Sequence, residues 1–176
     1  PLAVGDLNGD GREDFYAGGA KGQPGRLFFQ QPDGKFTHKD LSEGSESEDT
    51  GALVFDADGD GLPDLFVASG SSEFGPESPL YQSRLYRNDG KGNLHWAKKA
   101  LPEMRAPASC AAAADFDGDG DTDLFIGGSA LPGSYPQPAR SYLLRNNGGI
   151  FTDVTDSTFT AEQNSSFIIH HSSLEY

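Results

Sequence analysis

The apolar residues of this 176-residue chain fall in short runs, separated by turns rich in glycine, asparagine and aspartate. Runs of this length that contain aromatic and β-branched residues predict buried β-strands. No stretch of the sequence combines a long 3.6-residue period with helix caps, so helices should be scarce. The pattern therefore predicts an all-β chain.

The runs repeat in groups of four, which predicts three similar units. First strands are expected at 2–4, 52–55 and 111–114, second strands at 14–19, 64–70 and 123–128, third strands at 26–30, 84–88 and 141–146, and fourth strands at 35–38, 93–96 and 150–154. Asp-Gly or Asn-Gly turns at 32–34, 88–92 and 146–149 join the third strand to the fourth. Each unit therefore reads as four antiparallel strands.

One acidic motif, D-x-[DN]-x-D-G-x-x-D, lies between the first and second strand of every unit, at 6–14, 56–64 and 115–123. Oxygen ligands at alternate positions of a tight loop suit a hard cation, and Ca²⁺ most of all. The glycine at the sixth position allows the positive φ of a sharp turn. Plain Asp/Gly-rich turns are the alternative, but three aligned copies weigh against it.

An EF-hand begins in the same way but needs a bidentate Glu at position 12. That position holds Ala17, Val67 and Ile126, which cannot bind a metal. The loop must instead complete its coordination at position 9. Mg²⁺ suits such a loop less well, since it keeps several waters. Asn8 replaces Asp in the first loop, so the first site should bind more weakly than the other two.

The motifs start at residues 6, 56 and 115, and four-stranded units repeating every 50 or so residues are typical of β-propeller blades. We expect blade one at 1–50, blade two at 51–108, blade three at 109–156, and an irregular tail at 157–176, within which 167–169 could form a strand. Three blades do not close a propeller. The arc is therefore the remainder of a larger propeller or is completed by oligomerisation.

The motif, followed by an apolar strand and glycine, resembles the FG-GAP/VCBS repeat of integrin α-subunits and of many secreted bacterial proteins. The segments 48–51, 85–90 and 140–148 resemble the cartilage acidic protein-like branch. The likeness covers residues 1 to about 156 and implies about three Ca²⁺ ions, one per repeat. The ligands it implies, at motif positions 1, 3, 5, 7 and 9, are Asp6, Asn8, Asp10, Arg12, Asp14, Asp56, Asp58, Asp60, Leu62, Asp64, Asp115, Asp117, Asp119, Asp121 and Asp123.

The chain carries 27 acidic against 13 basic residues and a net charge of −14, which argues against binding to nucleic acid or anionic membranes. It has no apolar run long enough for membrane insertion. Cys110 is the one cysteine, so no internal disulfide forms, and we expect it to be a small buried core residue. Extracellular calcium modules bind Ca²⁺ at the high concentration found outside cells. Structural Ca²⁺ sites would therefore suit a secreted or cell-surface location.

The expected function is adhesion or the binding of a protein or carbohydrate ligand, without catalysis. The sequence lacks the nucleophile elbow, phosphate-loop and zinc motifs of common enzymes. The alternative is the propeller portion of a polysaccharide-degrading lyase or hydrolase. Two long insertions, 69–81 and 129–140, offer Tyr81, Arg84, Tyr135 and Arg140 as contact residues. These side chains could equally pack over the blade edges.

Overall fold

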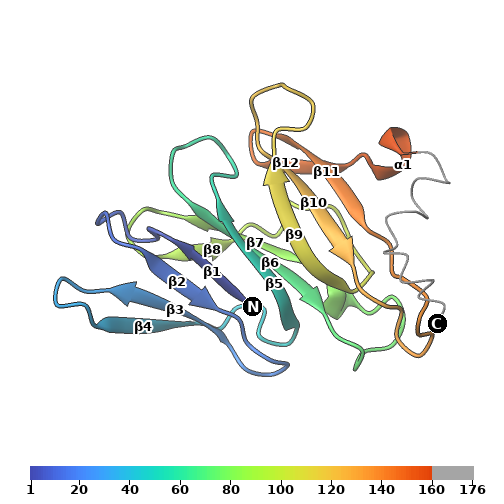
Figure 1. Cartoon of the computed structure of the whole chain (residues 1–176), viewed down its shortest axis with the longest axis horizontal. Helices are drawn as coiled ribbons and strands as arrows, with labels where there is room; N and C mark the ends of the chain where they lie inside the picture. The colour runs from blue at the N-terminus through green and yellow to red at the C-terminus, as the bar shows by residue number, and fades with distance from the viewer. Residues whose placement is uncertain (160–176) are drawn as a thin grey trace, which may run out of the picture.

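A computed structural model of the chain describes residues 1–159, and the predicted strand at 167–169 lies outside them. The described part is all-β, as predicted, and consists of three four-stranded antiparallel sheets that resemble propeller blades (Figure 1). Two short helical turns, η1 (Pro79–Tyr81) and α1 (Thr155–Thr158), are the helices of this part of the chain. Neither approaches the length and hydrophobicity needed to cross a membrane.

Each sheet follows the order of the chain. Sheet one holds β1 (Leu2–Gly5), β2 (Asp14–Ala17), β3 (Gly25–Gln30) and β4 (Phe36–Leu41). Sheet two holds β5 (Glu48–Phe55), β6 (Asp64–Gly70), β7 (Arg84–Asn88) and β8 (Leu94–Trp96). Sheet three holds β9 (Ala108–Ala114), β10 (Asp123–Gly128), β11 (Tyr142–Asn147) and β12 (Ile150–Asp153). Every predicted strand within residues 1–159 is found.

The second sheet begins earlier than the expected blade boundary at 51. β5 starts at Glu48, at the end of the acidic run 42–49. The amide of Asp49 donates to the carbonyl of Gly19 in sheet one at 3.1 Å, which ties this part of the strand to the preceding sheet. A register shift between Asp49 and Gly51 then carries β5 into its regular pairing with β6. Contact with sheet one therefore extends the strand toward its N-terminus.

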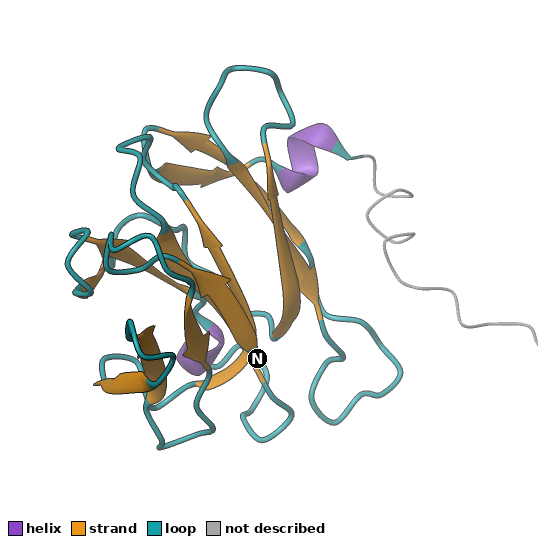
Figure 2. Ribbon diagram, turned by 60° about the vertical axis from the view of Figure 1, so that its left-hand side comes forward, coloured by secondary structure: helices purple, strands orange, loops and turns teal. Residues whose placement is uncertain are grey.

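The sheets stack face to face, with their first strands β1, β5 and β9 side by side (Figures 1 and 2). Side chains alternate between the two faces of a strand, so each sheet presents one face to the sheet before it and the other to the sheet after it. The apolar core accordingly lies between sheets. One cluster joins sheets one and two through residues such as Tyr16, Leu27 and Tyr86. A second cluster joins sheets two and three and includes Phe66 and Leu124.

A buried polar cluster also joins sheets one and two. Arg84 of β7 is 3% exposed and is paired with the carboxylate of Asp49. The second oxygen of Asp49 accepts hydrogen bonds from the Tyr16 hydroxyl at 2.7 Å and the Gly19 amide at 2.6 Å. The second terminal nitrogen of the Arg84 guanidinium, Nη1, donates to the carbonyl of Gly44 at 2.7 Å. Arg84 is therefore an internal cross-link between sheets, and its predicted role as a surface contact is wrong.

Candidate metal centre

The three acidic loops are built by the same hydrogen bonds around their first residue. One oxygen of Asp6 accepts from the amide of Gly9 at 2.8 Å, and the other accepts from the amide of Gly11 at 2.7 Å. Asp56 and Asp115 hold the glycines at positions 4 and 6 of their own loops in the same way, at 2.7 to 3.0 Å. The first carboxylate therefore shapes the loop through its own hydrogen bonds to the backbone.

The glycine at position 4 is a feature that the sequence analysis missed. Gly9, Gly59 and Gly118 have φ angles of 75°, 76° and 80°, a left-handed conformation that strains any residue with a side chain. The signal was present, because this position is glycine in all three copies. The motif is thus better written with two required glycines, at positions 4 and 6.

The ninth residue of each loop is a buried aspartate that joins three segments. One oxygen of Asp64 accepts from the amide of Ala57 in the loop at 3.1 Å, and the other accepts from the amide of Asn88 in β7 at 2.8 Å. Asp14 and Asp123 make the equivalent pairs of bonds in their own repeats. Each of these carboxylates is nearly inaccessible to solvent. It therefore links the loop to the second and third strands.

Burial changes the acidity of these carboxylates. Burial raises the pKa of Asp64 to about 6, against the lowering effect of the Asn88 and Ala57 amides, and the nearby Asp60 and Asp56 raise it further. The pKa of Asp14 is also raised, first by burial. Burial acts to raise the pKa of Asp6 as well, but its backbone hydrogen bonds, led by Gly11, outweigh it and the pKa lies below its usual value. A bound cation would favour the ionised form of each.

Two loops bring three carboxylates together. Oxygens of Asp56, Asp58 and Asp64 lie within 4.8 Å of one another, and the same holds for Asp115, Asp117 and Asp123. These are motif positions 1, 3 and 9. The predicted ligands at position 5, Asp60 and Asp119, do not belong to these groups. Oδ1 of each accepts from the amide at position 7, in Leu62 at 2.8 Å and Asp121 at 2.9 Å.

The first loop differs from the other two. The amide oxygen of Asn8 accepts from the backbone of Asp10 at 3.0 Å, and the carboxylate of Asp10 is paired with Arg12. Among the described residues, loop one therefore has no triple group of carboxylates like those of loops two and three. In loop three the side chain of Asp121 accepts from the amide of Gly148 at 2.8 Å. Position 7 thus has a different role in each repeat.

Asp58 provides the clearest sign that a group fits loop two. Its Oδ2 is paired with Arg87 of β7, whereas its Oδ1 is buried and has no hydrogen-bond partner. A buried carboxylate oxygen without a donor carries an uncompensated desolvation cost. Asp58 is one of the three residues of the carboxylate group formed with Asp56 and Asp64. A hard cation held by these residues would satisfy the unpartnered oxygen, so the residues present fit the ion that the motif predicts.

Comparison with known families agrees with this geometry. A model of the FG-GAP-like repeat matches the chain twice, over residues 6–67 and 56–126. Together the matches span more than half of the chain. The chain belongs to the FG-GAP-like repeat family. Each match starts at the first aspartate of one acidic loop, runs through the next loop and ends in the strand that follows it, β6 or β10. No curated protein matches the chain at a significant level.

The insertions of these FG-GAP-like repeats contain both buried and exposed residues. Tyr81 is fully buried, and its hydroxyl donates to the carbonyl of Phe74 at 2.9 Å, so its predicted contact role is wrong. Tyr135 is 88% exposed. Arg140 is exposed and binds both Asp153 and Asp156. Of the four predicted contact residues, Tyr135 and Arg140 therefore remain on the surface.

Cys110 is exposed, so the prediction that it is a buried core residue is wrong. The alanine run that follows it resembles core sequence, but β9 turns one face toward sheet two and the other away from it. Ala111 and Ala113 pack into the core between sheets two and three. Cys110 and Ala112 lie on the opposite face, which no other sheet of the described chain covers.

Proposed function

We propose that these FG-GAP-like repeats form a calcium-binding β-propeller module in which each acidic loop holds one structural Ca²⁺, about three in all. The observation that carries this proposal is the carboxylate group of Asp56, Asp58 and Asp64, with its buried and unpartnered Asp58 oxygen. The equivalent group of loop three supports it. Loop one, with Asn8 and the Asp10–Arg12 pair, should be the weakest site.

Calcium suits these loops better than other common ions. The side chains offer oxygen ligands alone, and the loop is an irregular turn rather than a rigid octahedral cage. In loop two, Asp56, Asp58 and Asp64 would hold the ion, with Asp60 and the carbonyl of Leu62 available beside them. The ion would neutralise crowded carboxylates and stiffen the connection between β5 and β6. We expect the same effect between β9 and β10.

We further propose that the module works outside the cell, by binding rather than by catalysis, in adhesion or in recognition of a protein or carbohydrate. The support is general: the acidic side chains gather in loops whose regular geometry suits a structural ion, and exposed insertions such as the one with Tyr135 offer contact surface. A net charge of −14 disfavours nucleic acid as a partner. Integrin-like or cartilage acidic protein-like function is part of this proposal.

Calorimetric titration of metal-free protein tests the calcium site. We expect binding of Ca²⁺ in preference to Mg²⁺, with loops two and three tighter than loop one. Asp58→Asn and Asp117→Asn should each weaken one site by at least tenfold, because each removes a charged ligand. Asp40→Asn is the matched control, since Asp40 lies on β4 and pairs with Arg26 away from the loops. No heat of Ca²⁺ binding, or equal loss in the control, would refute the proposal.

A panel of polysaccharides tests binding against catalysis. The calcium-loaded protein should retain a ligand without releasing new reducing ends or unsaturated products. Product release above that of heat-denatured protein would favour the lyase or hydrolase alternative. The same panel in chelator shows whether any binding depends on the loops.

A further inference from the structure

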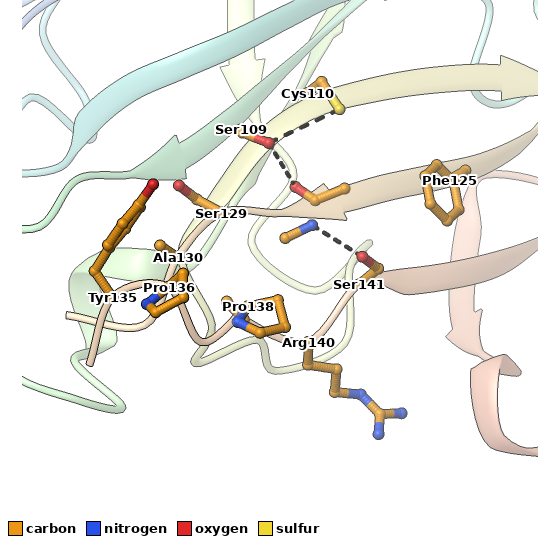
Figure 3. Close-up of a pocket in the computed structure, with 13 residues that line it drawn as sticks. Ser109, Cys110, Phe125, Ser129, Ala130, Tyr135, Pro136, Pro138, Arg140 and Ser141 are labelled. Atoms are coloured by element: carbon orange, nitrogen blue, oxygen red, sulfur yellow. Dashed lines mark hydrogen bonds between the residues drawn. The ribbon is translucent and has the colours of Figure 1, made fainter. Parts of the chain in front are cut away.

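The described residues form a hollow of about 730 Å³ between the start of β9 and the insertion that contains Tyr135 and Pro138 (Figure 3). In sheet two the equivalent place is filled by the next sheet. A Cβ added to Gly70, the equivalent of Ser129 in this hollow, would lie 2.2 Å from the carbonyl of Ala108 in β9. The hollow therefore corresponds to a contact between stacked sheets rather than to a ligand site.

A second hollow, of about 290 Å³, lies between sheets one and two and is here called the inter-sheet pocket. Sheet two contributes the turn 91–93 between β7 and β8. Sheet one contributes one residue of its acidic loop and four residues of the β3–β4 hairpin, which are Asn8, Phe29, Gln31, Thr37 and Lys39. Both walls of the pocket are therefore formed by sheets that the structure describes.

The inter-sheet pocket is basic, although the chain as a whole is acidic. Lys39 and Lys91 line it, and none of its lining residues is acidic. Nζ of Lys39 donates to two neutral acceptors, Asn93 Oδ1 at 2.8 Å and the carbonyl of Gly92 at 3.4 Å. The carboxylate of the nearby Asp89 is engaged by the turn itself, through the side chain of Asn93 and the amide of Lys91, each at 2.8 Å. Neither lysine forms an ion pair within residues 1–159, so both charges are available to an anion.

The equivalent place between sheets two and three is closed by an ion pair. Asn8 corresponds to Asp58, the third residue of the second acidic loop. Phe29 corresponds to Arg87, since each precedes the residue whose amide binds the buried ninth aspartate of its loop. Arg87 is paired with Asp58 and donates to the carbonyl of Gly149 at 2.8 Å. The two positions that neutralise each other at one sheet contact are both uncharged at the other, and neither cancels the charge of the lysines.

Neutral polar groups and an aromatic ring accompany the two charges. The side-chain amide of Gln31 donates to the hydroxyl oxygen of Thr37 at 3.1 Å, which leaves the hydroxyl hydrogen of Thr37 free to donate. The side-chain oxygen of Asn8 accepts from the amide of Asp10 at 3.0 Å, which leaves its NH₂ group free to donate. The ring of Phe29 supplies an apolar wall. An acidic peptide side chain would use the lysines alone, whereas a sugar also offers hydroxyl groups and an apolar C–H face to the other residues.

We propose that the inter-sheet pocket binds one acidic sugar unit, whose carboxylate or sulfate contacts Lys39 and Lys91 and whose ring lies against Phe29. The inference rests on the proposed carbohydrate-binding function and assigns the class of sugar. It requires the two lysines and no ion in the acidic loop. Because the chain carries a net charge of −14, the rest of its surface repels an anion, and binding is confined to this basic point.

Titration of the full chain with single sugars, followed by the NMR shifts of its backbone amides, tests this site. Glucuronate and glucose 6-sulfate should bind and should shift the amides of Gly92 and Asn93, and their relative affinities distinguish a carboxylate from a sulfate as the preferred anion. Neutral glucose should bind more weakly than either. Lys39→Gln and Lys91→Gln should each weaken binding roughly fivefold, between the value of an exposed ion pair and that of a buried charged hydrogen bond. Lys35→Gln is the matched control, because Lys35 lies in the same hairpin and pairs with Asp33, and it should leave the affinity unchanged.

Asn8→Asp separates this pocket from the calcium loop. The added carboxylate should weaken glucuronate binding, because it places a negative charge beside the lysines. The same change should strengthen Ca²⁺ binding at loop one, because it supplies the charged ligand that the other two loops have. Opposite changes in the two titrations cannot come from a general loss of structure. Calcium titration of each variant also reports on the loops independently of the sugar.

Several results would overturn the proposal. These are a wild-type protein that binds neither acidic sugar, equal affinity for glucose and glucuronate, inorganic sulfate bound as tightly as glucose 6-sulfate, and affinities unaffected by both lysine substitutions. Preferential binding of a hexaglutamate peptide would also overturn it, in favour of an acidic protein partner. A polysaccharide retained equally well by the variant with both lysines replaced would contradict this site and leave the proposed binding function standing.

Discussion

The guanidinium of Arg87 in β7 is paired with the carboxylate of Asp58, the third residue of the second acidic loop. The same side chain donates to the carbonyl of Gly149 in sheet three. One arginine therefore connects a candidate metal loop to the next sheet of the stack. Its positive charge also lies beside the group that we propose binds Ca²⁺, so it should affect stability and ion affinity in opposite directions.

Replacing this arginine separates the two effects. Arg87→Gln should lower the free energy of unfolding of the metal-free protein by about 1 kcal/mol, because an inter-sheet hydrogen bond is lost. The same change should strengthen Ca²⁺ binding in loop two by roughly threefold to tenfold, as removal of a like charge a few ångströms away is worth about 1 kcal/mol. Calorimetry and urea unfolding measure both. Arg26→Gln is the control, because Arg26 forms an exposed pair with Asp40. It should leave the Ca²⁺ affinity unchanged and should change the free energy of unfolding little.

The pH dependence of the free energy of unfolding should reveal the raised pKa of Asp64. Its pKa in the folded, metal-free protein is raised to about 6, above the unfolded value of about 3.9. Between these values the folded state holds the proton more tightly, so the free energy of unfolding should fall as pH rises from about 4 to about 6. Urea unfolding of metal-stripped protein across this range measures the slope. Asp64→Asn should flatten it, and an unchanged slope would show that another group is responsible.

The buried Asp49–Arg84 pair should behave as a cross-link between sheets one and two. Asp49→Asn or Arg84→Met alone leaves one charge buried without its partner and should cost about 3–5 kcal/mol. The double variant should cost less than the sum of the two, by about 0.5–3 kcal/mol, since the residues are in direct contact. A double-mutant cycle of unfolding free energies measures this coupling. Strict additivity would mean that the pair does not act as a unit.

The fourth-position glycines give a test of loop geometry alone. Gly59 has a φ of 76°, and a Cβ added there would meet nothing within 4 Å. Gly59→Ala should therefore cost about 1–2 kcal/mol through backbone strain rather than through a clash, and it should weaken Ca²⁺ binding at loop two. Gly75→Ala is the matched control, because that glycine also has open space and lacks a positive φ. Equal effects at both positions would contradict the assigned role of the loop conformation.

Local patterns in the sequence predicted the strands and the acidic loops because both depend on neighbours a few residues apart. The turn glycines and the aspartates recur at fixed spacing, so their roles could be read directly. The Asp49–Arg84 pair could not, because 35 residues separate its members and only the stacking of two sheets brings them together. Cys110 was misplaced for the same reason. Which face of β9 is covered depends on the order of the sheets, and the alanine run does not reveal it.

The prediction that the position-5 aspartates are ligands stays a prediction. Oδ1 of Asp60 accepts from the amide of Leu62, and Asp60 is not among the carboxylates of Asp56, Asp58 and Asp64 that lie together. Alternate spacing places oxygens near one another without fixing which rotamer each side chain adopts. The geometry consequently ranks Asp58 above Asp60 as a target for testing the metal site.

Thermal unfolding of the chain in chelator, and then with Ca²⁺ or Mg²⁺ restored, tests the central claim most directly. At a free Ca²⁺ about 100-fold above its Kd, one site stabilises the protein by roughly 2.7 kcal/mol, which corresponds to a rise in Tm on the order of 5–10 °C for a chain of this size. We predict that chelation lowers the Tm and that Ca²⁺ restores it more fully than Mg²⁺. A melting curve unmoved by chelator and by Ca²⁺ would contradict the account of these loops as structural calcium sites.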